Sequence, residues 1–303
     1  MIEEGYGGAF PAAGKTITFK TGAPLTSSGS VNARIEAHYS RAGLGELILA
    51  ALRQAGKDLA RLTVEDLAPL DEFHVRGREA TLELGRLAGL TAGSRVLDVG
   101  SGLGGPSRCI ARTFGCHVAG IDLTEEYCGV ATMLAKLTAM TDAVQYRQAD
   151  AMDLPFPAES FDVVWTQHTS MNIADKAGFF RELGRTLKRG GTLAVYDILA
   201  GPVTPIHFPV PWARVPGSSF LCTAGELRSI LEGNGYRIEA WQDSTDQARL
   251  WFTAVARRIQ ERGPAPLGLH LLMGDDFATM ANNQRRNLEE GRIATVQVVA
   301  RKI

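Results

Sequence analysis

The chain has 303 residues, with 32 Lys and Arg against 33 Asp and Glu, and 45% of its residues are hydrophobic. The balanced charge excludes a surface devoted to polyanions such as nucleic acid, and the apolar share excludes global disorder. No apolar run reaches the length of about 18 residues that a membrane-spanning helix needs. Glycine is over-represented, at 33 residues, so we expect glycines at positions where the backbone turns sharply or approaches a ligand.

Residues 1–30 are rich in Gly, Ser and Thr and lack hydrophobic periodicity. We interpret them as an arm or a lid that orders on binding. Glu3 and Glu4 stand where a signal peptide would carry basic residues, so this segment does not resemble one. The four cysteines show no CxxC spacing, which favours buried free thiols in a reducing cytoplasm over disulfides or a metal site.

From residue 31 to about residue 90 the hydrophobic pattern is helical. Apolar residues from Leu44 to Leu52 recur at spacings of three and four, which is typical of an amphipathic helix. Thr63 and Asp66 have the spacing of a capping box, which indicates the start of a short helix. The segment 31–90 is therefore predicted to be an N-terminal helical cover.

After residue 90, short apolar runs alternate with helical segments. Strands are expected at 95–99, 117–121, 143–147, 161–165 and 192–196, with helices at 107–114, 125–140 and 175–187. Such alternation predicts an α/β domain, residues 91–303, built on a mostly parallel sheet with helices on both faces.

The segment 199–222 interrupts this alternation with five prolines and little periodicity. It is too long for an ordinary connection, so we interpret it as a cover over the substrate. Thr223 and Glu226 form a second predicted capping box. A sixth strand at 237–241, helices at 247–259 and 267–291, and a last strand at 293–300 complete a seven-stranded sheet.

The first predicted strand leads into a glycine-rich turn at residues 96–105. Gly100, Gly102 and Gly104 follow a GxGxG spacing. A glycine turn after a strand occurs in several nucleotide-binding folds, but the dinucleotide fingerprint is GxGxxG. Asp98 lies at the end of the strand, where its carboxylate would repel a pyrophosphate and attract an ammonium group.

Two more carboxylates follow the next two strands. Asp122 comes 22 residues after Gly100, at the position from which a carboxylate accepts hydrogen bonds from ribose hydroxyls. Asp150 follows the third strand and could accept from an exocyclic adenine amine. An adenosine with a cationic amino-acid tail fits these carboxylates and Asp98 together.

Five segments in order resemble the motifs of the class I S-adenosylmethionine-dependent methyltransferases. The resemblance is to their small-molecule branch, which includes ubiquinone and menaquinone biosynthesis, phosphoethanolamine and sarcosine/dimethylglycine methyltransferases. It covers roughly residues 75–240 and implies a Rossmann-like sheet of seven strands with an antiparallel last strand. The matching segments are residues 96–105, 120–123, 149–152, 154–164 and 187–191.

The resemblance implies S-adenosyl-L-methionine as the cofactor and S-adenosyl-L-homocysteine as the product. By this resemblance, Gly100 and Gly102 contact the methionyl part, Asp122 the ribose, Leu123 the adenine face and Asp150 the adenine amine, while Asp98 orients the amino group. The predicted cofactor-binding residues are Asp98, Gly100, Ser101, Gly102, Asp122, Leu123, Asp150, Ala151, Met152 and Gln167.

Candidates for the methyl centre follow the fourth strand, because ligands of open α/β sheets lie at the carboxyl ends of the strands. His168 is predicted to act as a base or to hold the acceptor heteroatom, with a packed structural histidine as the alternative. Tyr39 falls where relatives place an N-terminal tyrosine over the cofactor, with core packing as its alternative.

The 199–222 segment offers His207, Trp212 and Arg214 as substrate-binding residues. A guanidinium can bind an acceptor carboxylate bidentately, and an indole can face a methylammonium group. The alternative is an aromatic plug packed on the sheet, with Arg214 in solvent.

The sequence thus predicts methyl transfer to a small-molecule acceptor, first of all N-methylation of a small amine or amino acid. O- or C-methylation of a natural-product or quinone-like intermediate is the alternative, and a nicotinamide-dependent oxidoreductase or a non-catalytic adenosyl-binding module stays open as a second class. We expect no nucleic-acid, membrane or metal partner, and a homodimer stays open.

Overall fold

The computed structural model describes residues 29–39 and 41–303, so most of the predicted arm at 1–30 lies outside the described residues. A single seven-stranded sheet has the order β3-β2-β1-β4-β5-β7-β6. Its strands are β1 (Arg95–Val99), β2 (His117–Asp122), β3 (Val144–Gln148), β4 (Phe161–Gln167), β5 (Leu187–Ala200), β6 (Tyr236–Asp243) and β7 (Ile293–Lys302). The pairs among β1 to β5 are parallel, and β7 runs antiparallel to both of its neighbours. The predicted fold class is confirmed.

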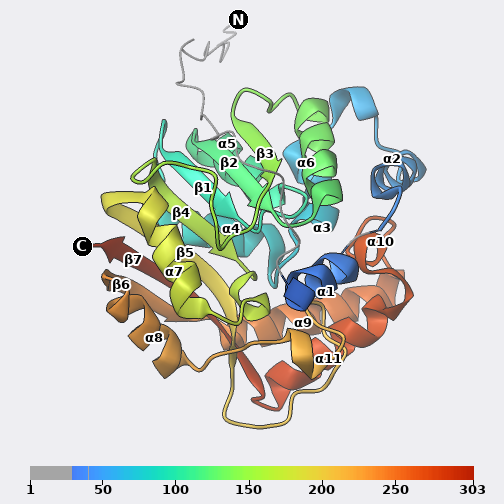
Figure 1. Cartoon of the computed structure of the whole chain (residues 1–303). Coiled ribbons are helices and arrows are strands. Elements are labelled where there is room, and N and C mark those ends of the chain that lie inside the picture. Colours follow the sequence, from blue (N-terminus) through green and yellow to red (C-terminus); the bar gives the residue numbers. More distant parts are fainter. Residues whose placement is uncertain (1–28, 40) are drawn as a thin grey trace, which may run out of the picture.

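Helices cover both faces of the sheet (Figure 1). The helices are α1 (Gly29–Tyr39), α2 (Leu44–Gln54), α3 (Val64–Asp71), α4 (Gly77–Leu87), α5 (Gly105–Phe114), α6 (Glu125–Leu137), α7 (Lys176–Thr186), α8 (Ala224–Gly233), α9 (Thr245–Arg262), α10 (His270–Met273) and α11 (Phe277–Glu289). One core cluster joins α4, α5 and α9 to the sheet, and a second joins α7 and α8 to the opposite face.

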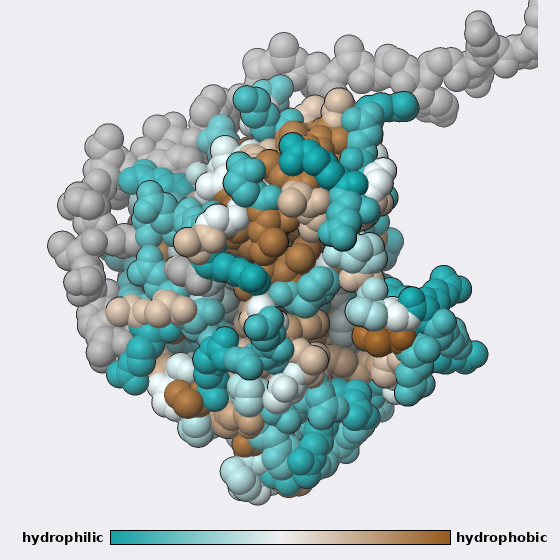
Figure 2. All heavy atoms as spheres, turned by 90° about the vertical axis from the view of Figure 1, so that its right-hand side faces the viewer, coloured by the Kyte–Doolittle hydropathy of each residue, from teal (hydrophilic) through white to brown (hydrophobic). Residues whose placement is uncertain are grey.

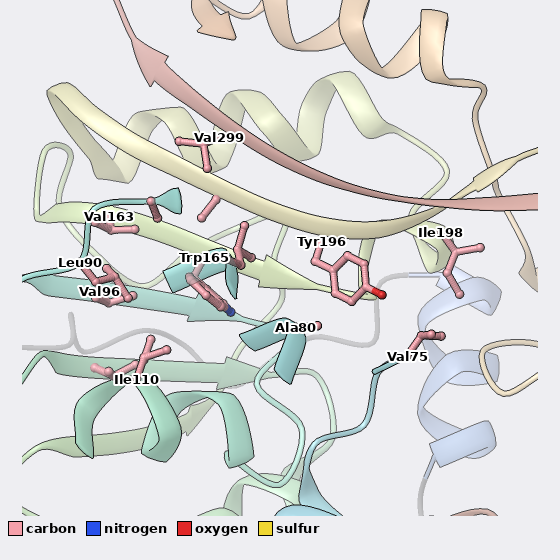
Figure 3. Packing of buried hydrophobic residues seen from close by; sticks show 14 of the residues in the cluster. Val75, Ala80, Leu90, Val96, Ile110, Val163, Trp165, Tyr196, Ile198 and Val299 are labelled. Atoms are coloured by element: carbon pink, nitrogen blue, oxygen red, sulfur yellow. The ribbon is translucent and has the colours of Figure 1, made fainter. Parts of the chain in front are cut away.

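Strand residues alternate between these two clusters, as the period of a strand requires. Trp165 on β4 and Tyr196 on β5 belong to the cluster under α4, whereas their chain neighbours Val164 and Val195 belong to the other. Figure 3 shows the rings of Trp165 and Tyr196 on the side of the sheet where Ala80 of α4 lies. The N-terminal helical segment is thus part of the main core.

A third cluster packs α2, α3, α6 and α10 together beside the sheet. Helices from both ends of the chain therefore meet here, since α2 and α10 are far apart in the sequence. Figure 2 views the molecule from this side and shows hydrophobic residues gathered in the upper middle of the face, within a largely hydrophilic surface.

The predicted start of the fifth strand, after the third helix of the α/β domain, is wrong. The helix α7 ends at Thr186, and β5 begins at Leu187, which pairs with Phe161 of β4. The predicted strand began only at residue 192, because two glycines at 190 and 191 were interpreted as the stop of the helix. The strand instead contains an irregularity here: the pairing with β4 shifts register after Leu187 and resumes at Thr192, and Gly190 has a positive φ of 69°.

Both predicted capping boxes are confirmed, at Thr63 with Asp66 and at Thr223 with Glu226. All four cysteines are buried and free, as expected. None of the helices in the described ranges is long and apolar enough to cross a membrane.

Candidate active site

A cavity of about 370 Å³ lies at the carboxyl ends of β1, β2 and β4. The sheet ends form its floor, and residues of α1, α9 and α11 line the opposite side. In Figure 1 these three helices gather beside the arrowheads of the central strands. The volume lies within the range of ordinary small-molecule sites, about 300–1,000 Å³.

The glycine turn after β1 forms one wall of the cavity. Gly100 has a φ of 76°, and a Cβ there would lie 2.2 Å from the Thr169 hydroxyl. At Gly105, where α5 begins, a Cβ would lie 2.2 Å from the backbone oxygen of Asp71. Only glycine fits at either position, so the turn can pack closely against Thr169 and the start of α5 against the end of α3.

Asp98 presents a buried carboxylate at the end of β1. Its side chain accepts a hydrogen bond of 2.6 Å from Ser107 and lines the cavity. Burial raises the pKa of Asp98 to about 7, although the bond from Ser107 opposes the shift. A cationic group in the cavity would restore the ionised form, because an opposite charge favours it.

Asp122 and Asp150 line the next part of the cavity. Each oxygen of Asp122 accepts one backbone N–H, from Gly102 at 2.9 Å and from Thr124 at 2.9 Å. The oxygens of Asp150 accept from the Asn32 amide at 2.9 Å and from the backbone of Met152 at 2.8 Å. A carboxylate offers about four lone-pair sites, so both can accept further bonds from a ligand.

Buried polar atoms without a partner among the described residues also line the cavity. They are the Ser101 hydroxyl, the Tyr127 hydroxyl and the Gln167 amide nitrogen. The oxygen of Gln167 is fixed by the Trp165 indole N–H at 2.9 Å and by Thr81 at 3.3 Å, which leaves its N–H₂ group as the free donor. Buried polar groups are normally paired, so this set indicates a polar ligand.

Two histidines meet at the other end of the cavity, with ring centroids 5.9 Å apart. His74 is tied down, because its Nε2 contacts the Thr81 hydroxyl at 3.0 Å. His168 has a positive φ of 51°, and its Nε2 is buried without a partner in the described protein. Burial and the neighbouring His74 hold the pKa of His168 well below its usual value, so the ring is a neutral acceptor at neutral pH.

Tyr39, at the end of α1, lies over the same region and donates to Asn172 at 3.2 Å. Its ring makes edge contacts with Phe73 and Tyr127. Burial raises the pKa of Tyr39 far above the neutral range, so its hydroxyl stays protonated. With His38 bound to the Pro211 carbonyl at 2.9 Å, α1 connects the sheet end to the 199–222 segment.

The predicted substrate-binding residues separate into two groups. Trp212 lines the cavity, with 1% of its surface exposed and its indole N–H bound to Ser219. His207 and Arg214 do not line it, so their binding of the acceptor stays a prediction. His207 binds Glu290 at 2.9 Å, and Arg214 pairs with Asp276 with about half of its side chain exposed. Their partners are the residue that follows α11 and the residue that precedes it, and neither partner lines the cavity.

One wall of the cavity is not predictable from the sequence motifs. Six residues between β6 and β7 line it: Trp251, Phe252, Leu269, Phe277, Ala281 and Gln284. The segment 199–222 contributes only Pro211 and Trp212. The length of the β6–β7 connection could have indicated this wall. A hairpin between the last two strands of such a sheet needs only a few residues, so the remaining residues are available for another role.

The fold and the site together define a Rossmann-like protein whose cavity suits an adenosine with a cationic amino-acid tail. Residues 97–195 match the family model described as a methyltransferase domain. The chain is 32% identical over 232 residues to 27-O-demethylrifamycin SV methyltransferase of Amycolatopsis mediterranei (strain S699), covering 74% of this chain and 84% of the relative. It is 31% identical over 202 residues to methyltransferase GfsG of Streptomyces halstedii, covering 67% of this chain and 70% of the relative. The chain belongs to the class I S-adenosylmethionine-dependent methyltransferases that act on small molecules.

Solved structures show the same fold at low sequence identity. The [4+2]-cyclase SpnF superposes with a TM-score of 0.63 at 21% identity, covering 91% of this chain and 97% of the other. Phosphoethanolamine N-methyltransferase 2 of Haemonchus contortus, in complex with S-adenosyl-L-methionine, superposes with a TM-score of 0.70 at 19% identity. The superposition covers 91% of this chain and 60% of the other. Membership of the S-adenosylmethionine-dependent family, shown by the curated relatives, makes S-adenosyl-L-methionine the cofactor of this enzyme, and the partnerless donors and buried Asp98 at the strand ends fit such a ligand.

Proposed function

We propose that this enzyme methylates a hydroxyl oxygen of a mostly apolar small molecule, with His168 as the general base. The observation that carries the proposal is a neutral, buried histidine with a partnerless Nε2 at the edge of an aromatic and aliphatic chamber. A hydroxyl must lose its proton as it attacks the methyl group, and a base at this place can accept that proton.

On the cofactor side, we assign Asp98 to the amino group, Asp122 to the ribose hydroxyls and Asp150 to the adenine amine. Ser101 and Gln167 supply donors, Gly100 and Gly102 allow close approach, and the surface for the adenine comes from Leu123, Ala151 and Met152. When bound, the cofactor supplies an electrophilic methyl group. The residues of this chain align the acceptor and exclude water, which is where much of the acceleration of a displacement arises.

On the acceptor side, His168 takes the hydroxyl proton at a ring nitrogen, and the low pKa of His168 keeps that nitrogen unprotonated beforehand. Tyr39 stays protonated and donates to Asn172, so it orients the acceptor region rather than removing a proton. The lining residues of α9 and α11 include no carboxylate. Carboxylates elsewhere in the lining, such as Asp71 and Asp175, are bound to Arg108 and to the Gly178 N–H.

N-methylation of a small amine is the second candidate. Tyr39, Trp212 and Trp251 all line the cavity, and aromatic faces attract ammonium groups. The wall formed by α9 and α11 carries no carboxylate, which favours a neutral acceptor, and a curated relative is named for O-methylation. Among acceptors offered with S-adenosyl-L-methionine, we therefore expect release of S-adenosyl-L-homocysteine with aromatic and alicyclic alcohols in preference to amines.

The variant His168→Gln tests the base. Because general-base catalysis contributes roughly 10²–10⁴-fold, kcat should fall by about that factor for a hydroxyl acceptor. Calorimetry should show unchanged affinity for S-adenosyl-L-homocysteine, since the assigned cofactor contacts remain. His117→Gln, at the start of β2 and away from the cavity lining, is the matched control and should keep wild-type kcat.

The pH profile provides a second readout of the same role. With the pKa of His168 lowered, its base form persists through the neutral range, so kcat should stay constant until the pH is well below 6.5. Retention of wild-type kcat by His168→Gln, or a loss confined to cofactor affinity, would remove the assigned role.

A further inference from the structure

The residue Gln284 differs in kind from its surroundings in the acceptor chamber. It lies on α11, at the end of a face that also includes Phe277 and Ala281, at the spacings of a single helix face. The facing residues Trp251 and Phe252 on α9 are aromatic. A polar amide is thus set into an apolar wall.

Gln284 lines the cavity, and only 6% of its surface is exposed. Its amide has no hydrogen bond to any residue that the structure describes. Buried polar side chains are normally paired, so the Gln284 amide at the cavity wall is available to a hydrogen-bonding group of a ligand that enters the cavity.

The neighbouring amides of α11 have structural tasks that Gln284 lacks. Asn283 donates to the Pro209 carbonyl at 3.0 Å. Asn287 accepts from the His207 N–H at 2.9 Å and donates to the His207 carbonyl at 3.0 Å. These two residues brace the 199–222 segment against α11, and the helix holds Gln284 in place between them.

We propose that Gln284 determines acceptor specificity by binding a second oxygen function of the acceptor, apart from the hydroxyl beside His168. An amide is both a donor and an acceptor of hydrogen bonds, so it can bind either a hydroxyl or a carbonyl. The substrate class is then a mostly apolar molecule that carries two oxygen functions: one is methylated, and Gln284 holds the other. This inference rests on the proposed hydroxyl methylation.

Binding to the protein loaded with S-adenosyl-L-homocysteine tests the inference without turnover. Calorimetry should show that wild-type protein binds dihydroxynaphthalene roughly tenfold or more tighter than naphthol, because only the former supplies a partner for the amide. The variant Gln284→Leu should lose this preference and bind both compounds alike. Equal binding of the two compounds by wild type, or a preference that survives in Gln284→Leu, would overturn the inference.

Gln284→Glu separates a hydrogen-bonding role from simple filling of space. A carboxylate accepts from a hydroxyl but cannot donate to a carbonyl, so this variant should keep the preference for dihydroxynaphthalene and lose binding of acetylnaphthol. Loss of the preference for dihydroxynaphthalene in Gln284→Glu would contradict direct contact. Arg285→Gln, on the exposed side of α11, is the matched control and should behave as wild type.

Turnover separates this inference from the proposed function. If S-adenosyl-L-homocysteine is released with amines and not with hydroxyl compounds, the proposed hydroxyl methylation is wrong, whatever the binding data show. If hydroxyl compounds are methylated but Gln284→Leu leaves the ratio of kcat/KM between dihydroxynaphthalene and naphthol unchanged, only the role of Gln284 is wrong.

Discussion

At the scale of single residues, Asp98 couples the protonation state of the cavity to its ligand. The carboxyl is buried, with the Ser107 hydroxyl as a donor, and burial raises the pKa of Asp98 to about 7 in the protein without ligand. An ammonium group beside it requires the ionised form. Binding of S-adenosyl-L-methionine below pH 7 must therefore release a proton, and acid opposes binding.

We expect the affinity for S-adenosyl-L-methionine to fall as the pH decreases below about 7, approaching tenfold per pH unit. Calorimetry between about pH 5 and about pH 8 measures this slope. Asp98→Asn should bind more weakly at neutral pH and lose the slope, because it has no proton to release. A wild-type affinity that is constant over this range would show that Asp98 does not meet the ammonium group.

The sequence could predict the residues around Asp98 because they belong to one short strand and turn. It could not predict the state of His168, since the missing partner of Nε2 depends on what packs around the ring. Nor could it predict that the Asp150 carboxylate accepts from Asn32, which lies 118 residues away in the chain. Local patterns identify candidate groups, whereas contacts between distant segments decide how each one is used.

At the scale of elements, a buried ion pair joins α5 to α3. The Arg108 guanidinium contacts the Asp71 carboxylate, and both side chains are essentially inaccessible to solvent. Arg108 also donates to the Leu103 carbonyl at 2.8 Å and to the Ala131 carbonyl at 3.3 Å. The N-terminal helical cover is thereby fixed to the helix that follows the glycine turn.

Arg108→Met should lower the free energy of unfolding by about 3–5 kcal/mol, because Asp71 would remain buried without its counter-charge. Urea denaturation measures the change. Arg112→Met, at an exposed position of the same helix, should change stability by no more than about 0.5 kcal/mol. Similar stability of the two variants would mean that solvent or another group compensates Asp71.

Most element boundaries were predictable because strands and helices have different hydrophobic periods. The start of β5 was not, since its glycines indicate a stop in the sequence, whereas in the structure they lie within the strand at a shift in its pairing with β4. The helices α9 and α11 were predicted as helices, but periodicity does not show which surface a helix covers. Their place in the acceptor wall therefore emerged only from the structure.

At the scale of the whole molecule, the cavity joins distant parts of the chain, among them α1, the ends of the central strands, and the β6–β7 connection. The bond from Asn32 to Asp150 and the bond from Tyr39 to Asn172 connect the first part to the second. A ligand between these parts should therefore stabilise all of them together.

S-adenosyl-L-homocysteine at about one hundred times its Kd should raise the free energy of unfolding by about 2.7 kcal/mol. In hydrogen exchange, the amides of α1 should become more protected on binding, because α1 lies over the ligand. The amides of α8, which does not line the cavity, are the internal control. Their protection should increase only by the amount that follows from the higher free energy of global unfolding. Unchanged exchange in α1 would show that this helix closes independently of the cofactor.

The position of β7 between β5 and β6 also has a consequence for the order in which the molecule is made. Both neighbours of β7 precede it in the chain, and it forms the pairs that join them. A nascent chain that has not yet reached residue 293 therefore presents two open strand edges, which invite pairing with other chains. The wall carried by α9 and α11 lies on the connection that β7 anchors. During translation, the cofactor side can thus take shape early, whereas the acceptor chamber is completed among the last parts of the enzyme.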